Sequence, residues 1–198
     1  MNRALVIVIT VISLAIYQYV KQRELVHPPG ILVSVEPVQK DSISEKPIKY
    51  KDAVIEPLAE YQIEARVLST ERYWFDKMAK IAPTDLAVGW QEMSNSKIID
   101  QLSIRQADRF YFYSWSGAAP LEPQMIVRTS ANMHLIPSTE YINQEIKNLH
   151  KGNIVSLRGY LVRVNFPDGS EIKSSLSRTD SGPGACEVMW VQSLNVEK

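Results

Sequence analysis

The sequence predicts a mostly β domain with one or two short helices, preceded by a single N-terminal transmembrane helix. Three observations support this: an uncharged apolar run near the start, alternating apolar and polar residues in several later segments, and one amphipathic helical pattern followed by glycine. The 198 residues suffice for one ordinary domain, and a hydrophobic content of 45% excludes a disordered chain.

The membrane segment is Ala4–Val20, which contains no charged residue. Its length is at the short end of the ~17–25 residues that a spanning helix needs. Tyr17 and Tyr19 follow the most apolar part, where interfacial aromatic residues are expected, and Lys21 and Arg23 lie just beyond them. We therefore expect residues 4–20 to anchor the chain in a membrane.

Two alternatives to an uncleaved anchor remain: a cleaved signal peptide with its small-residue site at Ser13–Ala15, and a buried core helix. The flanking charges Arg3, Lys21 and Arg23 give almost no bias in orientation. A short N-terminal tail before one anchor favours a soluble domain on the non-cytoplasmic side, and the opposite orientation stays open.

The charges balance over the whole chain, at 22 basic and 22 acidic residues. Residues 1–24 hold three of the basic residues and one of the acidic, so the remainder carries a net charge of −2. A nucleic-acid partner is therefore not expected, because phosphate binding needs concentrated positive charge. The single cysteine, Cys186, excludes an internal disulfide and is compatible with either side of the membrane.

Three parts are predicted: the anchor with its flanks at 1–24, a Pro-containing linker at 25–49, and a domain at 50–198. Pro28, Pro29, Pro37 and Pro47 favour an extended linker. Within it, Ile31–Glu36 is predicted as a short strand.

In the first half of the domain, alternating apolar and polar residues or a high aromatic content predict several strands, and one short helix is predicted between them. The strands are Tyr61–Val67, Leu86–Trp90, Arg109–Trp115 and an extended segment Met125–Ile136, and the helix is Ser94–Ile104.

The last third has a helix, a hairpin and a final strand. Ser138 or Thr139 caps a helix with Ile142, Ile146 and Leu149 on one face, and Gly152 ends it. The segments that follow are a strand at Asn153–Asn165 that bends at Gly159, a turn at Phe166–Ser170, a returning strand at Glu171–Arg178, a loop at Thr179–Ala185 and a strand at Cys186–Val191.

This order resembles the OB-type Greek-key barrel, in which a helix separates the third strand from the last two. The resemblance is one of topology and covers about residues 58–195. The helix near 96–104 and an extra C-terminal strand depart from the pattern. The resemblance implies a β-barrel-like fold.

Asn132 and His134 form the first polar pair, because residues two apart on a strand point to the same face. His134 is a candidate general base, binding residue or metal ligand. The alternative is a structural pair that satisfies backbone groups.

The loop Arg178–Cys186 is the second candidate. Its glycines could cradle an anion beside Arg178, although no phosphate-loop motif is present, and the alternative is a wide turn between strands. Cys186 is expected to be a small buried residue, and a hydrolase that pairs His134 with Asp180 or Cys186 is the enzymatic alternative.

The third candidate is aromatic. Tyr111, Tyr113 and Trp115 share one face of a strand, where they could stack on a ligand or fill a barrel interior. No HExxH, GxSxG or clustered histidine motif occurs, so we expect no metal and no cofactor.

We therefore expect a binding or interaction module in the cell envelope whose partner is another envelope protein or a small polar ligand. The alternatives are the envelope hydrolase and, less favoured, a nucleic-acid binder facing the cytoplasm.

Overall fold

The computed structural model describes residues 6, 8, 9, 12, 24–41, 43–180, 182 and 184–197. The predicted membrane segment, 4–20, lies outside the described residues except at 6, 8, 9 and 12. No helix in the described ranges is both long enough and apolar enough to cross a bilayer.

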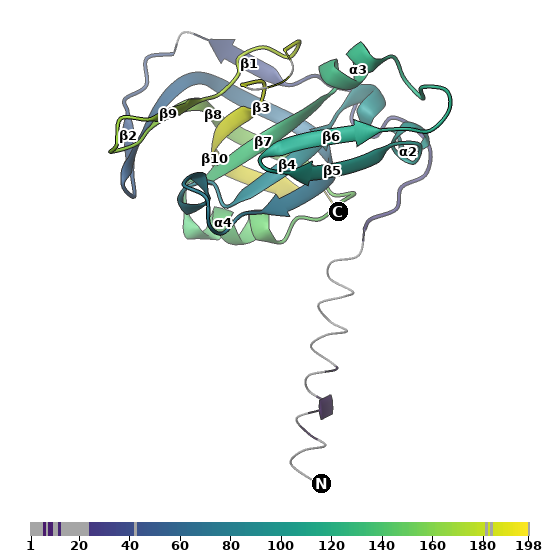
Figure 1. The fold of residues 1–198 in the computed structure, drawn as a ribbon, viewed down its shortest axis with the longest axis horizontal. Coiled ribbons are helices and arrows are strands. Elements are labelled where there is room, and N and C mark those ends of the chain that lie inside the picture. The colour runs from purple at the N-terminus through teal and green to yellow at the C-terminus, as the bar shows by residue number, and fades with distance from the viewer. Residues whose placement is uncertain are drawn as a thin grey trace.

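The described chain is mostly β, as predicted, and Figure 1 shows curved strands lying side by side with few helices. The strands are β1 (Val38–Asp41), β2 (Ile48–Tyr50), β3 (Ala53–Arg72), β4 (Thr84–Gly89), β5 (Ser103–Ala107), β6 (Phe110–Ser114), β7 (Ser130–Pro137), β8 (Ile154–Asn165), β9 (Glu171–Lys173) and β10 (Glu187–Val196). The helices are α2 (Ser96–Ile99), α3 (Pro123–Arg128) and α4 (Glu140–Lys147), with 3-10 turns η1 (Met78–Lys80) and η2 (Gln91–Ser94).

The main sheet has the strand order β1-β3-β4-β7-β10-β8-β9. Because β8 also pairs with β3, the pairings β3–β4–β7–β10–β8 return to their starting strand. Every pair in this circuit is antiparallel except β7 with β10, which is parallel. Strands β5 and β6 form a separate hairpin.

Strand β3 serves two neighbours because it is long and bent. It pairs with β8 over residues 54–66 and with β4 over 66–72. Its register shifts between Pro57 and Ala59 and between Val67 and Ser69. Proline has no N–H to give to a ladder, so its place at an irregularity in the strand follows from its chemistry.

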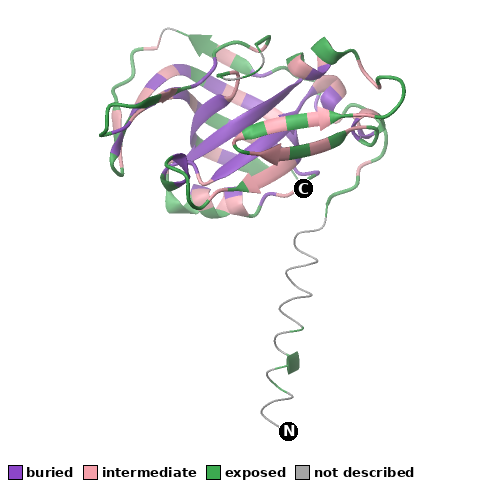
Figure 2. Cartoon of the chain, viewed as in Figure 1, coloured by how far each residue is buried: buried purple, intermediate pink, exposed green. Residues whose placement is uncertain are grey.

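The main core lies inside the circuit of strands, where Figure 2 shows the buried residues concentrated. Helix α4 connects β7 to β8 and adds Ile142 and Ile146 to this core. Its N-cap is Thr139, whose Oγ1 accepts a bond of 3.2 Å from the Ile142 amide, and Gly152 follows the helix with a φ of 95°. The predicted helix is therefore confirmed, with its capping residue.

Gly159 lies where β8 approaches β10 most closely. A Cβ on this residue would lie 1.9 Å from the carbonyl oxygen of Trp190, so only glycine fits. The sequence predicted a bend at this glycine, and β8 pairs with β10 over residues 155–161 and with β9 over residues 163–165.

Four predicted segments differ. The strand predicted at Glu171–Arg178 ends at Lys173, the last residue of β9. Ile31–Glu36 is not a strand: the amides of Leu32 and Val33 both donate to the Ser94 hydroxyl, so a side chain occupies the donors that a ladder would use. The first strand is instead β1. The segment predicted as a linker thus contributes β1 and β2, both paired with β3.

The other two differences lie between β4 and β7. The helix predicted over 94–104 ends at Ile99, and Ser103 begins β5 because the residues that follow pair with the aromatic strand β6. The segment 125–136 begins as helix α3, for which Pro123 supplies a favourable first position, and becomes extended only at Ser130.

Candidate functional site

The ladder between β4, β7 and β10 places the candidate residues together. Asp85 of β4 lies directly opposite His134 of β7, and Val188 of β10 pairs with His134 on the other side. Two residues before Val188 on the chain is Cys186. The register therefore brings an aspartate, a histidine and a cysteine to one region of the sheet from segments about 50 residues apart.

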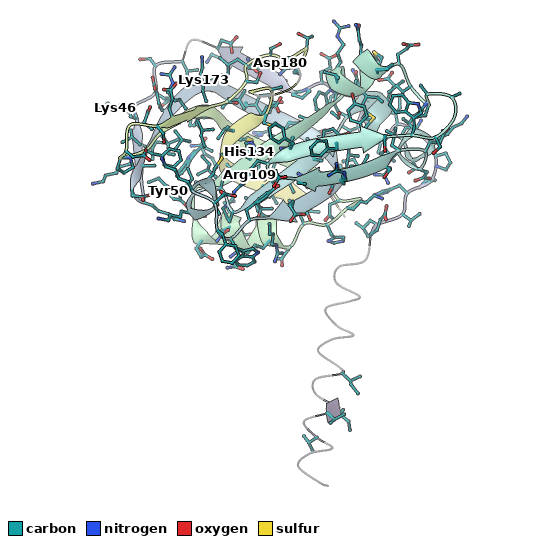
Figure 3. The ribbon with its side chains drawn as sticks, in the orientation of Figure 1. Lys46, Tyr50, Arg109, His134, Lys173 and Asp180 are labelled. Carbon is teal, nitrogen blue, oxygen red and sulfur yellow. The ribbon has the colours of Figure 1, made fainter. Side chains whose placement is uncertain are left out.

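Asp85 is fully buried between two cationic side chains. Its Oδ2 lies 2.9 Å from Nδ1 of His134, and its Oδ1 accepts a hydrogen bond of 2.7 Å from Nη1 of Arg109. Figure 3 shows His134 and Arg109 close together near the centre of the molecule. A buried carboxylate with such partners is strongly held, because each charge offsets the desolvation of the other.

Arg109 fastens the β5–β6 hairpin over the sheet. Arg109 follows Asp108 in the hairpin turn, and both residues have positive φ, which is 51° for Asp108 and 69° for Arg109. This conformation is unfavourable for arginine, and the surroundings hold it in place. Its amide donates to the Tyr73 hydroxyl, and its carbonyl accepts from Nδ2 of Asn132.

The guanidinium group of Arg109 is also fully engaged. It makes two bonds to the Asp76 carboxylate, of 2.8 and 3.0 Å, and lies 3.8 Å from the centre of the Tyr73 ring. It also bonds the carbonyl of Ala82. The loop between β3 and β4 is thus tied to the hairpin.

Cys186 lies at the edge of this network and is partly exposed. Its sulfur lies 3.5 Å from Nδ2 of Asn132 and 3.8 Å from the carbonyl oxygen of Arg109. Its thiol also interacts with the His134 imidazole. The imidazole therefore lies between the Asp85 carboxylate and the Cys186 thiol.

The charge of His134 follows from these neighbours. Burial lowers the pKa of His134, but the hydrogen bonds to Asp85 and Cys186 and their negative charge outweigh burial and raise it to about 9. The imidazole is therefore protonated at neutral pH, which favours a negative partner on each side.

A pocket of about 310 Å³ opens beside Cys186. Its walls come from β6, α3, the start of β7 and the loop before β10. The apolar part includes Phe110, Phe112 and Val127, and the polar part includes Asn132 and Asp180. Asp180 is the charged side chain on the described part of this wall.

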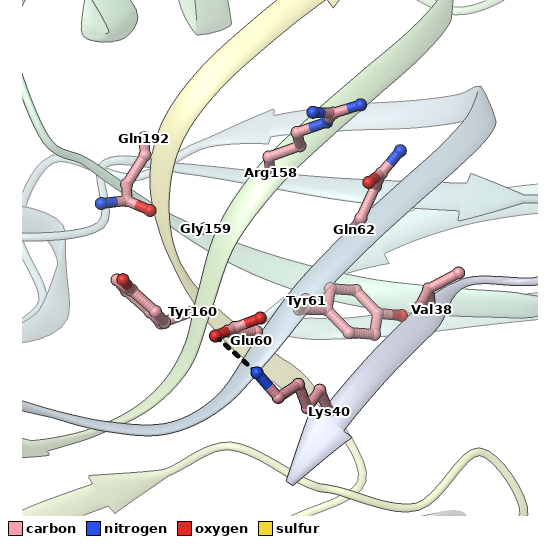
Figure 4. A pocket seen from close by; sticks show the side chains of 9 residues that line it. All are labelled: Val38, Lys40, Glu60, Tyr61, Gln62, Arg158, Gly159, Tyr160 and Gln192. Atoms are coloured by element: carbon pink, nitrogen blue, oxygen red, sulfur yellow. Dashed lines mark hydrogen bonds and ion pairs between the residues drawn. The ribbon is translucent and has the colours of Figure 1, made fainter. Parts of the chain in front are cut away.

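A second hollow, of about 330 Å³, lies over β1, β3, β8 and β10 (Figure 4). Its walls include Lys40, Glu60, Arg158 and Gln192, and Lys40 pairs with Glu60 at 3.3 Å across its floor. Both members of this pair are exposed.

The predicted site residues divide into two sets. The residues brought together at the pocket or in its wall are Asn132, Cys186, Asp180, Tyr111 and Tyr113, with His134 directly behind Cys186. Arg178 lies elsewhere, where it bonds Gln39 and the carbonyl of Pro37, and Trp115 stacks on Tyr113 outside the pocket lining.

Asp180 is not shown in contact with His134. Its Oδ2 accepts a bond of 2.6 Å from the Ser175 hydroxyl, and the carboxylate beside His134 belongs to Asp85. Sequence reasoning missed Asp85 and Arg109. The available signal was a charged residue inside the apolar run from Ile81 to Trp90, since such a residue is rarely buried without a partner.

No group of three or more His, Cys, Asp or Glu side chains in the described ranges is arranged to hold a metal ion. The chain matches no protein-family model, no curated protein and no solved structure. The site must therefore be interpreted from its own geometry.

Proposed function

We propose that this chain is a membrane-anchored binding module whose OB-type barrel takes a small ligand in the pocket beside Cys186. The pocket itself carries the proposal, because it combines apolar walls with a few polar groups at one end. Small-molecule sites in proteins have this composition and a volume of ~300–1,000 Å³.

The strand order supports the OB-type barrel. Strands β3, β4, β7, β8 and β10 pair in a closed circuit, with α4 between β7 and β8 and with β7 parallel to β10. Barrels of this type bind ligands on the face of the second and third strands, which correspond to β4 and β7. The β5–β6 hairpin covers much of that face here, and the pocket lies at its edge.

The walls indicate the class of ligand. Phenylalanine and valine side chains suit an aromatic or aliphatic group, while Asn132 and Ser130 offer hydrogen bonds. Asp180 disfavours an anion and favours a neutral or cationic end. The same carboxylate disfavours a nucleic-acid backbone.

The first experiment compares two probes with one ring and opposite charges, phenethylamine and phenylacetate. We expect ligand-observed NMR to show phenethylamine binding to the full chain in detergent and phenylacetate binding at least about 5-fold more weakly, a difference of about 1 kcal/mol. Asp180→Asn should remove this preference.

A matched pair of variants locates the binding. Val127→Trp fills the pocket from α3 and should abolish phenethylamine binding, whereas Val26→Trp, at a residue 89% exposed, should leave it unchanged. Equal binding by both variants, or no binding of phenethylamine at millimolar concentration, would overturn the proposal.

The anchor and the side of the membrane rest on the sequence. We propose that residues 4–20 hold the domain in the cell envelope on the non-cytoplasmic side. Alkaline phosphatase fused to the C-terminus should be active, because this enzyme needs an oxidising compartment to form its disulfides. Inactivity together with fluorescence of a matched cytoplasmic reporter fusion would place the domain inside.

A further inference from the structure

We propose that Cys186 is the nucleophile of a thiol-dependent acyl-transfer site, with His134 as its proton partner and Asp85 as the residue that positions His134. The acyl group would be a small aromatic or aliphatic one held in the pocket, so this inference rests on the pocket of the proposed function. It adds a covalent step to what that pocket does.

The first argument is the order of the three side chains. The Asp85 carboxylate contacts Nδ1 of His134 at 2.9 Å, and the same imidazole interacts with the Cys186 thiol. A nucleophile next to a base that a third group orients is the arrangement that activates cysteine and serine nucleophiles. The ladder fixes it, because the three residues come from neighbouring segments β4, β7 and the start of β10.

The second argument is accessibility. Asp85 is fully buried and His134 is 6% exposed, whereas Cys186 is partly exposed and lines the pocket. The member of the set that must meet the substrate is thus the one open to it. A cysteine that served only to fill the core would not need this exposure.

The third argument is charge. The Arg109 guanidinium and the Asp85 carboxylate form a buried pair behind the imidazole, and His134 carries a proton at neutral pH. The imidazole thus places a positive charge beside the sulfur. The other acidic group near His134 is Glu187, with Asp180 facing Glu187 from the loop.

Asn132 completes the site. Its Nδ2 lies 3.5 Å from the sulfur and donates one hydrogen to the carbonyl of Arg109. The second hydrogen of this amide is directed to the sulfur, where it would stabilise negative charge on Cys186. Gln106 holds the amide by donating to its oxygen at 2.7 Å.

The reaction is balanced with an ester as the acyl donor. The Cys186 thiolate attacks the carbonyl carbon of p-nitrophenyl acetate, the S–C bond forms, and the C–O bond breaks with release of p-nitrophenolate. After p-nitrophenolate leaves, the His134 imidazolium releases its proton to the solvent. Neutral His134 then accepts a proton from the water that attacks the acetyl thioester, the S–C bond breaks, and acetic acid leaves and ionises to acetate. The thiolate and the imidazolium are thereby restored.

The decisive test is the alkylation of Cys186 by iodoacetamide as a function of pH. The chain has one cysteine, so the mass of the intact full-length protein in detergent reports this thiol alone. We expect a rate at pH 6 at least about 10-fold above that of a cysteine in an unstructured peptide, whose pKa is ≈ 8.5.

His134→Gln should return the profile to that of the peptide, and His150→Gln, at a partly exposed position after α4, is the matched control that should not change it. If His134→Gln does not fold, the wild-type profile still decides. A wild-type thiol that reacts like the peptide, or does not react at any pH, overturns the proposal.

The second test uses p-nitrophenyl acetate. We expect a burst of one p-nitrophenolate per chain and a mass increase of one acetyl group, both lost in Cys186→Ser and both at least about 10-fold slower in Asn132→Ala. A chain that binds phenethylamine but shows no acetylation retains the proposed binding function and loses this inference. Acetylation without phenethylamine binding would retain this inference and overturn the proposed binding function.

Discussion

Two acidic side chains, Asp85 and Glu187, are buried on opposite faces of the same sheet, and their surroundings differ. Asp85 lies on the outer face of β4 and contacts both Arg109 and His134. Glu187 begins β10, in alternation with Met189 and Val191 of the inner core, and its Oε2 has no hydrogen-bond partner in the described part of the chain. Their exposed fractions are almost equal, at 0% and 4%.

The difference shows two ways to bury a carboxyl group. Asp85 keeps its charge next to cationic partners. Burial instead raises the pKa of Glu187 to about 8, with a further increase from Asp180 and opposing effects from Arg178 and His134. A group without a close cation is more easily buried neutral than charged.

Asp85→Asn should have the largest effect on stability. The change removes the charge that holds Arg109 and His134 and leaves two cations buried without their partner. Breaking a buried pair in this way costs about 3–5 kcal/mol. Urea unfolding should show this loss, with Glu197→Gln as an exposed control. A loss below about 1 kcal/mol would mean that the network contributes little.

Glu187→Gln should stabilise the protein at pH 8 by about 4 kcal/mol and have little effect at pH 4. The folded protein holds the Glu187 proton to about pH 8, whereas the unfolded chain releases it near pH 4.5. The wild type therefore loses stability as the pH rises between these values, and the glutamine variant does not. A stability difference that stays constant over this range would show that the carboxyl is solvated or paired.

His134→Gln tests the other member of the comparison through a different pH window. The folded pKa of about 9 lies above the ordinary histidine value of 6.5. The contribution of the protonated imidazole is therefore complete below pH 6.5 and is lost as the pH rises to 9, with a magnitude of about 3 kcal/mol. Urea unfolding at several pH values should show the two proteins converging at alkaline pH. If the two stabilities converged at acidic pH instead, the expected direction of this pH dependence would be contradicted.

The sequence was sufficient for the parts of the fold that depend on local pattern. Thr139, the apolar face of α4, Gly152 and the alternation before Val67 all act within a few residues, and the corresponding elements are present. Ser94 and Pro123 show where local pattern failed. Ser94 takes up the amides of a segment 60 residues away, which no window of sequence reveals.

The sequence predicted part of the candidate site. Asn132 and His134 were paired correctly because a strand places alternate residues on one face, and Cys186 was named with His134. The carboxylate beside His134 is that of Asp85 and not Asp180, because the register of β4 against β7 decides which acid lies opposite His134. That register is set by the whole ladder and by the hairpin that Arg109 fixes.

The smallest expected effect concerns the ion pair Lys40–Glu60 in the second hollow (Figure 4). Its members are joined at 3.3 Å, with side chains 70% and 49% exposed. Water already solvates both charges, so Lys40→Ala should change the free energy of unfolding by less than about 0.5 kcal/mol. Urea unfolding at low and at 1 M salt should give the same difference within that limit. A larger effect would mean that an ion pair contributes to stability on this sheet even when both charges are exposed. The contrast between Asp85 and Glu187 would then need a cause other than burial.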